Sequence, residues 1–169
     1  MSTTLIKDVK ETFIKEFNTE PLLIFSPGRI NIIGEHTDYN GGFVFPAAVD
    51  KGIVAAIQKS NSGSCTAVAL DLDSTIQFDL NSLKPSKEGS WENYVFGVVA
   101  EIQNRNKIIG DFNIVFKGNI PGGAGMSSSA ALENSVVFGL NELFDLELTK
   151  REMILISQKA EHNYVGVKC

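Results

Sequence analysis

The chain has 169 residues, of which 43% are hydrophobic and 21% are charged. This composition is typical of one globular domain and argues against a disordered or fibrous protein. The formal net charge is −5, and a mildly acidic chain without a basic run argues against nucleic acid as a partner. No stretch reaches the roughly 18 apolar residues of a membrane helix, so no membrane partner is expected. Two cysteines, Cys65 and Cys169, make no disulfide framework and favour a cytoplasmic location.

The first half of the chain predicts one helix followed by several strands. Leu5, Val9, Phe13 and Phe17 recur at every fourth residue, which is typical of an amphipathic helix, and Pro21 marks its exit. Apolar runs and alternating segments then predict strands, the first of which we expect to stop at the Ser-Pro-Gly turn. The predicted strands are 22–25, one or two within 43–58, 64–70 and 75–80.

The sequence predicts mainly helices in the second half of the chain. An apolar stripe predicts a helix over 91–104, and alternating aromatic and apolar residues predict a strand over 111–117. A Gly-rich loop at 118–125 leads into a helix that reaches about residue 144. Thr149, followed three residues later by an acid, predicts a capping box at the start of the last helix. Because strands mainly come first, we expect an α+β fold with helices on one face of a mixed sheet.

The segment from Pro121 to Ser129 combines three glycines with three consecutive serines. Glycines let the backbone turn tightly and gather N–H groups, and a following helix N-terminus adds a partial positive charge. The simple alternative is a turn with a serine N-cap, but a cap needs fewer of these residues, so we expect phosphate binding. No lysine follows Gly125, which excludes a Walker A loop, and Ser128 stands where a dinucleotide fingerprint has its third glycine.

A second polar segment follows the first predicted strand. Glu35, His36, Thr37 and Asp38 place donors and acceptors on four successive residues, before a sharp turn at 40–42. Such a group suits a polyhydroxylated ligand or a hard metal ion bound through oxygen atoms. An ordinary solvated polar loop is the alternative that the residues alone leave open.

Three segments together resemble the galactokinases, which belong to the GHMP superfamily of small-molecule kinases. The segment 27–42 resembles the galactokinase signature, and 122–130 resembles the phosphate loop of the wider superfamily, which includes the homoserine, mevalonate and phosphomevalonate kinases. The segment 160–166 resembles a third galactokinase motif. The resemblance implies phosphorylation of galactose by Mg-ATP at the anomeric hydroxyl. It also implies a ribosomal protein S5 domain 2-like fold for residues 1–169, as the N-terminal domain of a longer protein.

The resemblance also assigns roles to individual residues. Arg29 is expected beside the catalytic centre, where it would stabilise developing charge. Trp91 resembles an aromatic near the adenine, which is a weaker correspondence. The remaining assignments are a sugar site of Glu35, His36, Thr37 and Asp38, a triphosphate site of Gly123, Ala124, Gly125, Met126, Ser127, Ser128 and Ser129, and Mg²⁺ ligands Ser129 and Glu161.

The chain departs from the family pattern at its end. Galactokinases carry a catalytic aspartate beyond the position of Glu161, and the sequence stops at Cys169 before that segment. We therefore expect an N-terminal part that is inactive alone, with the C-terminal domain as its intramolecular partner. Two alternatives stay open: a galactokinase-like sensor of sugar and ATP, which the intact phosphate loop disfavours, and a kinase for N-acetylgalactosamine.

Overall fold

A computed structural model describes residues 3–34, 37, 40–87 and 89–167. The chain begins with helix α1 (Thr3–Phe17), continues through the strands β1 (Leu22–Ile33) and β2 (Phe45–Lys59), and ends in helical structure. Most predicted elements are present, and the α+β class is confirmed. The other elements are β3 (Cys65–Ala69), the short helix η2 (Leu70–Leu72), β4 (Ser74–Phe78), α2 (Glu92–Gln103), β5 (Phe112–Gly118), α3 (Ser128–Phe144), α4 (Lys150–Ala160) and the π-helical turn η3 (Glu161–Val165).

The strands of the described chain form one mixed sheet in the order β1-β2-β5-β3-β4. Neighbouring strands are antiparallel, except that β3 runs parallel to β5. The strand β2 is buried on both faces over 52–57, and its side chains alternate between two cores. Ala55 and Ile57 belong to the larger core, whereas Val54 and Ala56 belong to the smaller one.

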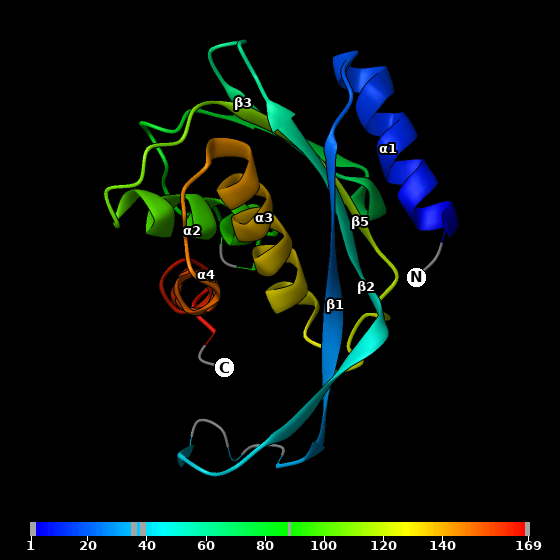
Figure 1. Ribbon diagram of the computed structural model, residues 1–169, viewed down its shortest axis with the longest axis vertical. Helices are drawn as coiled ribbons and strands as arrows, with labels where there is room; N and C mark the ends of the chain where they lie inside the picture. Colours follow the sequence, from blue (N-terminus) through cyan, green and yellow to red (C-terminus); the bar gives the residue numbers. More distant parts are fainter. Residues whose placement is uncertain (1–2, 35–36, 38–39, 88, 168–169) are drawn as a thin grey trace.

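The helices divide unequally between the two faces of this sheet (Figure 1). The larger core joins the sheet to α2, α3 and α4, which agrees with the prediction of helices on one face. The helix α1 differs, because its buried residues Leu5, Val9 and Phe13 pack on the opposite face. The sequence pattern shows that this helix is amphipathic, but the pattern does not say which face of a sheet it covers.

The first strand is longer than predicted. The expected stop at Ser26-Pro27-Gly28 is wrong, since β1 continues to Ile33. Proline lacks an N–H donor and is tolerated in strands at the edge of a sheet, where β1 lies. Instead of ending the strand, the turn residues shift its register: Pro27 pairs with Gly52, and Arg29 pairs with Ala48.

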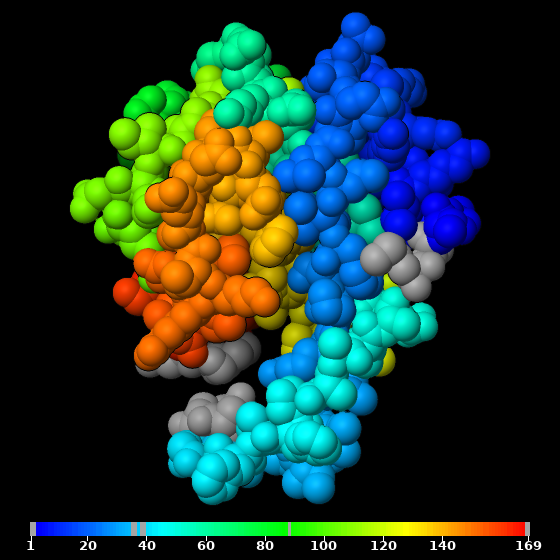
Figure 2. Space-filling view, in the orientation of Figure 1, coloured from blue at the N-terminus to red at the C-terminus, as the bar shows by residue number. Residues whose placement is uncertain are grey.

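The far end of the β1–β2 hairpin projects from the body of the molecule (Figure 2). Its large apolar side chains are exposed, with Phe43 at 99%, Ile33 at 71% and Phe45 at 62%.

The capping box that begins α4 is confirmed, because Thr149 accepts from the Glu152 N–H and the Glu152 carboxylate accepts from the Thr149 N–H. No helix of the described chain is long and apolar enough to cross a membrane.

Candidate active site

The Gly-rich loop has a backbone that glycine adopts at little cost. Gly123 and Gly125 have φ values of +71° and +65°, in the left-handed region. A Cβ built on either residue would meet no atom within 4 Å, so conformation rather than space requires glycine. The loop is exposed and leads directly into α3. The free N–H groups of the first helical turn therefore favour an anion at this end of α3.

Ser127 occupies the N-cap position of α3, but its side chain makes no capping hydrogen bond. Its Oγ instead accepts a hydrogen bond of 2.7 Å from Nη2 of Arg29. The alternative in which a serine side chain caps the helix is therefore wrong for Ser127, although this residue stands at the N-cap position. The contact joins the two polar segments that the sequence singled out, across a separation of 98 residues.

The backbone of β1 also approaches the loop closely. The Arg29 N–H donates to the Met126 carbonyl at 3.1 Å. A Cβ on Gly28 would lie 2.8 Å from that same carbonyl oxygen, so glycine is required by the approach. The start of the loop is held as well: the Asp71 carboxylate accepts from the Gly118 N–H, and the Asn119 side chain accepts from the Gly52 N–H. The loop is thus fastened to the sheet on both sides.

The polar segment after β1 is described only at Thr37. Its Oγ1 lies 2.5 Å from the Gly34 carbonyl and 3.0 Å from the Phe43 carbonyl, so the hydroxyl holds its own loop. The predicted sugar-site residues Glu35, His36 and Asp38 lie outside the described residues. Their assignment stays a prediction, whereas the described Thr37 contacts are internal to the turn.

Two acidic side chains lie near each other, one on α3 and one at the start of η3. Glu161 begins η3 and is 8% exposed, and Glu133 on α3 is fully buried. Neither carboxylate oxygen of Glu133 has a hydrogen-bond partner in the described structure. Burial, and secondarily the charge of Glu161, raise the pKa of Glu133 to about 9. Ser129 lies four residues before Glu133 and therefore on the same face of the helix.

Trp91 lies against the end of β5 rather than at an open surface. Its ring meets that of Phe116 edge to face, with centroids 5.4 Å apart, and its Nε1 donates to Ser74 Oγ. The side chain is half-buried and packs on the larger core. These contacts give Trp91 a structural role, and its proximity to adenine stays a prediction.

Sequence reasoning missed Glu133, Asp71 and Asn119. Glu133 had a usable signal, because the positions three and four residues away on its side of α3 are all small or apolar: Ser129, Ala130, Val136 and Val137. Asp71 and Asn119 had no such signal in the sequence, because each is an ordinary polar residue in a connection. Only the fold brings the Asp71 carboxylate to the Gly118 N–H at the end of β5 and the Asn119 side chain to the Gly52 N–H of β2.

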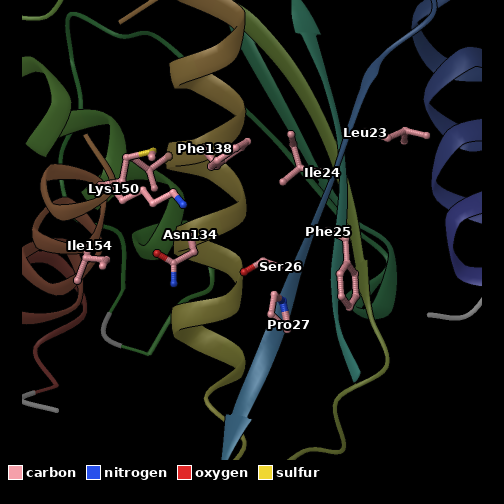
Figure 3. Close-up of a pocket in the computed structure, with 11 residues that line it drawn as sticks. Leu23, Ile24, Phe25, Ser26, Pro27, Asn134, Phe138, Lys150 and Ile154 are labelled. Carbon is pink, nitrogen blue, oxygen red and sulfur yellow. The ribbon is translucent and has the colours of Figure 1, made fainter. Parts of the chain in front are cut away.

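A hollow of about 760 Å³ lies beside this site, between the free edge of β1 and the helices α3 and α4 (Figure 3). Figure 3 shows Asn134 on the side of α3 that faces α4, where its Oδ1 accepts from Ser157 Oγ, and it shows Ser26 and Pro27 of β1 at one end of the hollow. Its lining contains neither the Gly-rich loop nor Arg29, Ser129 or Glu161. We therefore place the candidate active site at the Arg29–Ser127 junction and not in this largely apolar hollow.

Two family models match the chain. The galactokinase galactose-binding signature matches residues 11–59, and the GHMP kinases N-terminal domain matches residues 93–169. Arg29 lies within the first match and Ser127 within the second. Their hydrogen bond is therefore a contact between the two matched regions.

Curated relatives agree over nearly the whole chain. The galactokinase of Clostridium perfringens is 44% identical over 166 residues, covering 96% of this chain and 43% of the relative. The galactokinase of Fusobacterium nucleatum is 43% identical over 170 residues, covering 99% of this chain and 43% of the relative. The chain thus spans less than half the length of these relatives.

Solved structures show the same similarity. The Lactococcus lactis galactokinase, crystallised with galactose, superposes with a TM-score of 0.88 at 37% identity, over 95% of this chain and 42% of that one. The Methanococcus jannaschii mevalonate kinase has a TM-score of 0.77 at 20% identity, over 87% of this chain and 48% of that one, which shows a shared fold.

Proposed function

Because the chain belongs to the galactokinase family of the GHMP kinases, we propose that the protein carrying it phosphorylates galactose with ATP. The γ-phosphoryl group would pass to the anomeric oxygen, giving galactose 1-phosphate and ADP. One observation carries the proposal: the hydrogen bond from Arg29 to Ser127 joins the region matched by the galactose-binding signature to the Gly-rich loop.

The described residues would supply two of the elements that phosphoryl transfer needs, a phosphate-binding loop and a fixed positive charge. The transition state is stabilised mainly by positioning and by neutralising charge on the transferring group. The loop from Gly123 to Ser129 would hold the triphosphate through backbone N–H groups and serine hydroxyls. Arg29, held beside this loop by its bond to Ser127, would place a fixed positive charge near the transferring phosphoryl group.

The donor set behind α3 fits a magnesium ion. Glu133 is buried without a hydrogen-bond partner in the described structure, and burial first and the charge of Glu161 second raise its pKa, so a cation held beside these two groups would favour their ionised forms. Ser129 and Glu161 would hold the ion, which would neutralise phosphate charge. Ser129 and Glu161 alone would not fill the coordination of Mg²⁺, so phosphate oxygens and water would complete it.

The proposal extends to organisation and location. We place residues 1–169 as the N-terminal domain of a longer two-domain kinase, in keeping with the 43% coverage of the relatives. Its second domain would form the other wall of the active site. We also propose a cytoplasmic location, which is in keeping with the proposed use of ATP as the phosphoryl donor.

The test is a coupled ADP-release assay on the full-length protein with Mg-ATP and separate sugars. We expect ADP release that depends on galactose, and a product whose phosphorus signal couples to the anomeric proton. ADP release with N-acetylgalactosamine but not with galactose would mean that N-acetylgalactosamine, and not galactose, is the substrate. Tight binding of sugar and ATP without ADP release would favour a sensor, and failure to bind either ligand would refute the proposal.

We predict that Asp38→Ala in the full-length protein weakens galactose binding far more than ATP binding. A site that hydrogen-bonds hydroxyl groups leaves buried partners unpaired when one group is lost, at a cost of about 1–3 kcal/mol. Titration of each substrate measures the difference. Asp73→Asn, on an exposed turn beside the opposite edge strand of the sheet, is the control for losing an acidic charge. An unchanged galactose affinity would remove Asp38 from the sugar site.

We predict that Ser129→Ala raises the Mg²⁺ concentration needed for half-maximal activity. A hydroxyl at the end of the anion-binding loop is an oxygen ligand suited to a hard cation. Ser135→Ala on the same helix is the matched control, because that hydroxyl donates to the Leu132 carbonyl within the helix. If both variants keep the parent's Mg²⁺ dependence, Ser129 has only a local structural role.

A further inference from the structure

The chain leaves regular α-helical geometry at Glu161. The helix α4 ends at Ala160, and the next five residues form the π-helical turn η3, in which the N–H groups of Gly166 and Val167 donate to the Glu161 carbonyl. Single π turns are rare and are frequent at functional sites. Such a turn changes the direction of its side chains, so whatever holds η3 also sets the position of the Glu161 carboxylate.

The helix α2 lies directly against this turn at Gly97. A Cβ on Gly97 would lie 2.9 Å from the Ala160 Cβ, 3.0 Å from the Ala160 Cα and 3.0 Å from the Tyr164 Cβ. Real Cβ atoms essentially never approach closer than 3.0 Å, and these atoms belong to two residues, Ala160 and Tyr164, that lie on either side of Glu161 in the sequence. Glycine inside a helix costs about 1 kcal/mol relative to alanine, so close packing and not helix propensity explains it.

One helical turn after Gly97, α2 presents the buried carboxylate of Glu101, which is 4% exposed. Its Oε1 accepts a 3.0 Å hydrogen bond from Nδ2 of Asn163, in the middle of η3. Its Oε2 lies 3.5 Å from Nη1 of Arg105, which also donates to the Glu101 carbonyl at 3.0 Å. Arg105 therefore balances the buried charge, while the other oxygen fastens η3.

We propose that Gly97 and Glu101 are positioning residues for Glu161. This inference rests on the proposed function, in which Glu161 holds Mg²⁺. The two α2 residues form a clamp: Gly97 sets how closely η3 approaches α2, and Glu101 sets the orientation of η3 through Asn163. Mg²⁺ demands near-ideal distances of about 2.0–2.1 Å, so a small displacement of η3 weakens the metal site. The region matched by the galactose-binding signature, residues 11–59, contributes no residue to these contacts of α2 with η3.

The test measures Mn²⁺ binding, as a stand-in for Mg²⁺, to the full-length protein with a non-hydrolysable ATP analogue, by electron paramagnetic resonance. Removing a partner that orients a metal ligand typically lowers metal affinity about 10–100-fold, and we expect this range for Glu101→Leu. Asn163→Ala removes only the donor from an exposed side chain, should fold normally, and should weaken Mn²⁺ binding in the same direction. Galactose affinity should stay within about twofold in both, since the sugar segment is untouched.

Two further variants separate positioning from general loss of stability. Glu101→Gln keeps an oxygen that accepts from Asn163 and should recover most of the Mn²⁺ affinity. Val98→Ala removes buried volume from the same helix but leaves Gly97 and Glu101 in place, so its Mn²⁺ affinity should match the parent's. Parent-like Mn²⁺ binding by Glu101→Leu and Asn163→Ala overturns the inference, and so does an equal loss in Val98→Ala. If the unaltered protein fails to release ADP with galactose, the proposed function fails instead.

Discussion

Arg29→Ala in the full-length protein is expected to lower kcat by about 10²–10³-fold, the usual cost of removing one preorganised group that stabilises transition-state charge. The guanidinium is held beside the Gly-rich loop by its bond to Ser127 and by the backbone bond from Arg29 to Met126. In the proposed function this charge would act mainly on the transferring phosphoryl group, so the KM for galactose should change little. Steady-state kinetics with both substrates varied measure the two effects.

Arg29→Lys is the matched variant, since it keeps the charge but loses the planar, forked donor geometry. We expect it to recover only part of the rate. Arg151→Lys controls for the same replacement at an exposed arginine of α4, outside the loop. A large rise in the KM for galactose with kcat unchanged would place Arg29 in sugar binding rather than in catalysis.

Glu133→Gln is expected to remove a pH dependence from the stability of the metal-free protein. The unfolded carboxyl loses its proton near pH 4.5, whereas the pKa of Glu133 in the fold is raised to about 9, by burial first and by Glu161 second. Folding therefore takes up a proton between these values, and stability falls as pH rises. From about pH 5 to about pH 8 this linkage is worth at most about 4 kcal/mol, which glutamine abolishes.

Denaturant unfolding in the presence of a chelator, repeated across that pH range, measures this slope. The amide of glutamine is also buried without a partner, so the test is the change of stability with pH and not its value at one pH. Glu142→Gln, on an exposed position of α3, should leave the slope as in the parent. An equal slope in Glu133→Gln and the parent would mean that Glu133 is ionised in the folded protein.

Local sequence patterns determined most elements of this protein. The spacing of four residues between Leu5, Val9 and Phe13 predicts α1, and the Thr149–Glu152 capping box predicts the start of α4. Both patterns depend on contacts within a few residues. The Gly-rich loop was also predicted from local sequence, because its conformation depends on the residue type at each position. Glycines at 123 and 125 have φ values that other residues avoid. The sugar segment was assigned from its resemblance to the galactokinase signature, and its residues Glu35, His36 and Asp38 lie outside the described residues.

Only the tertiary structure decided what depends on contacts between distant segments. It places Pro27 in an edge strand, where its missing N–H costs no ladder bond, and so lets β1 run on to Arg29 and beyond. It brings Arg29 to Ser127, and it buries Glu133 beside Glu161 without a hydrogen-bond partner in the described structure. The physical reason is that sequence patterns report the conformations a segment prefers locally, whereas the register of β1 and the packing of α2 on η3 follow from which apolar faces bury one another.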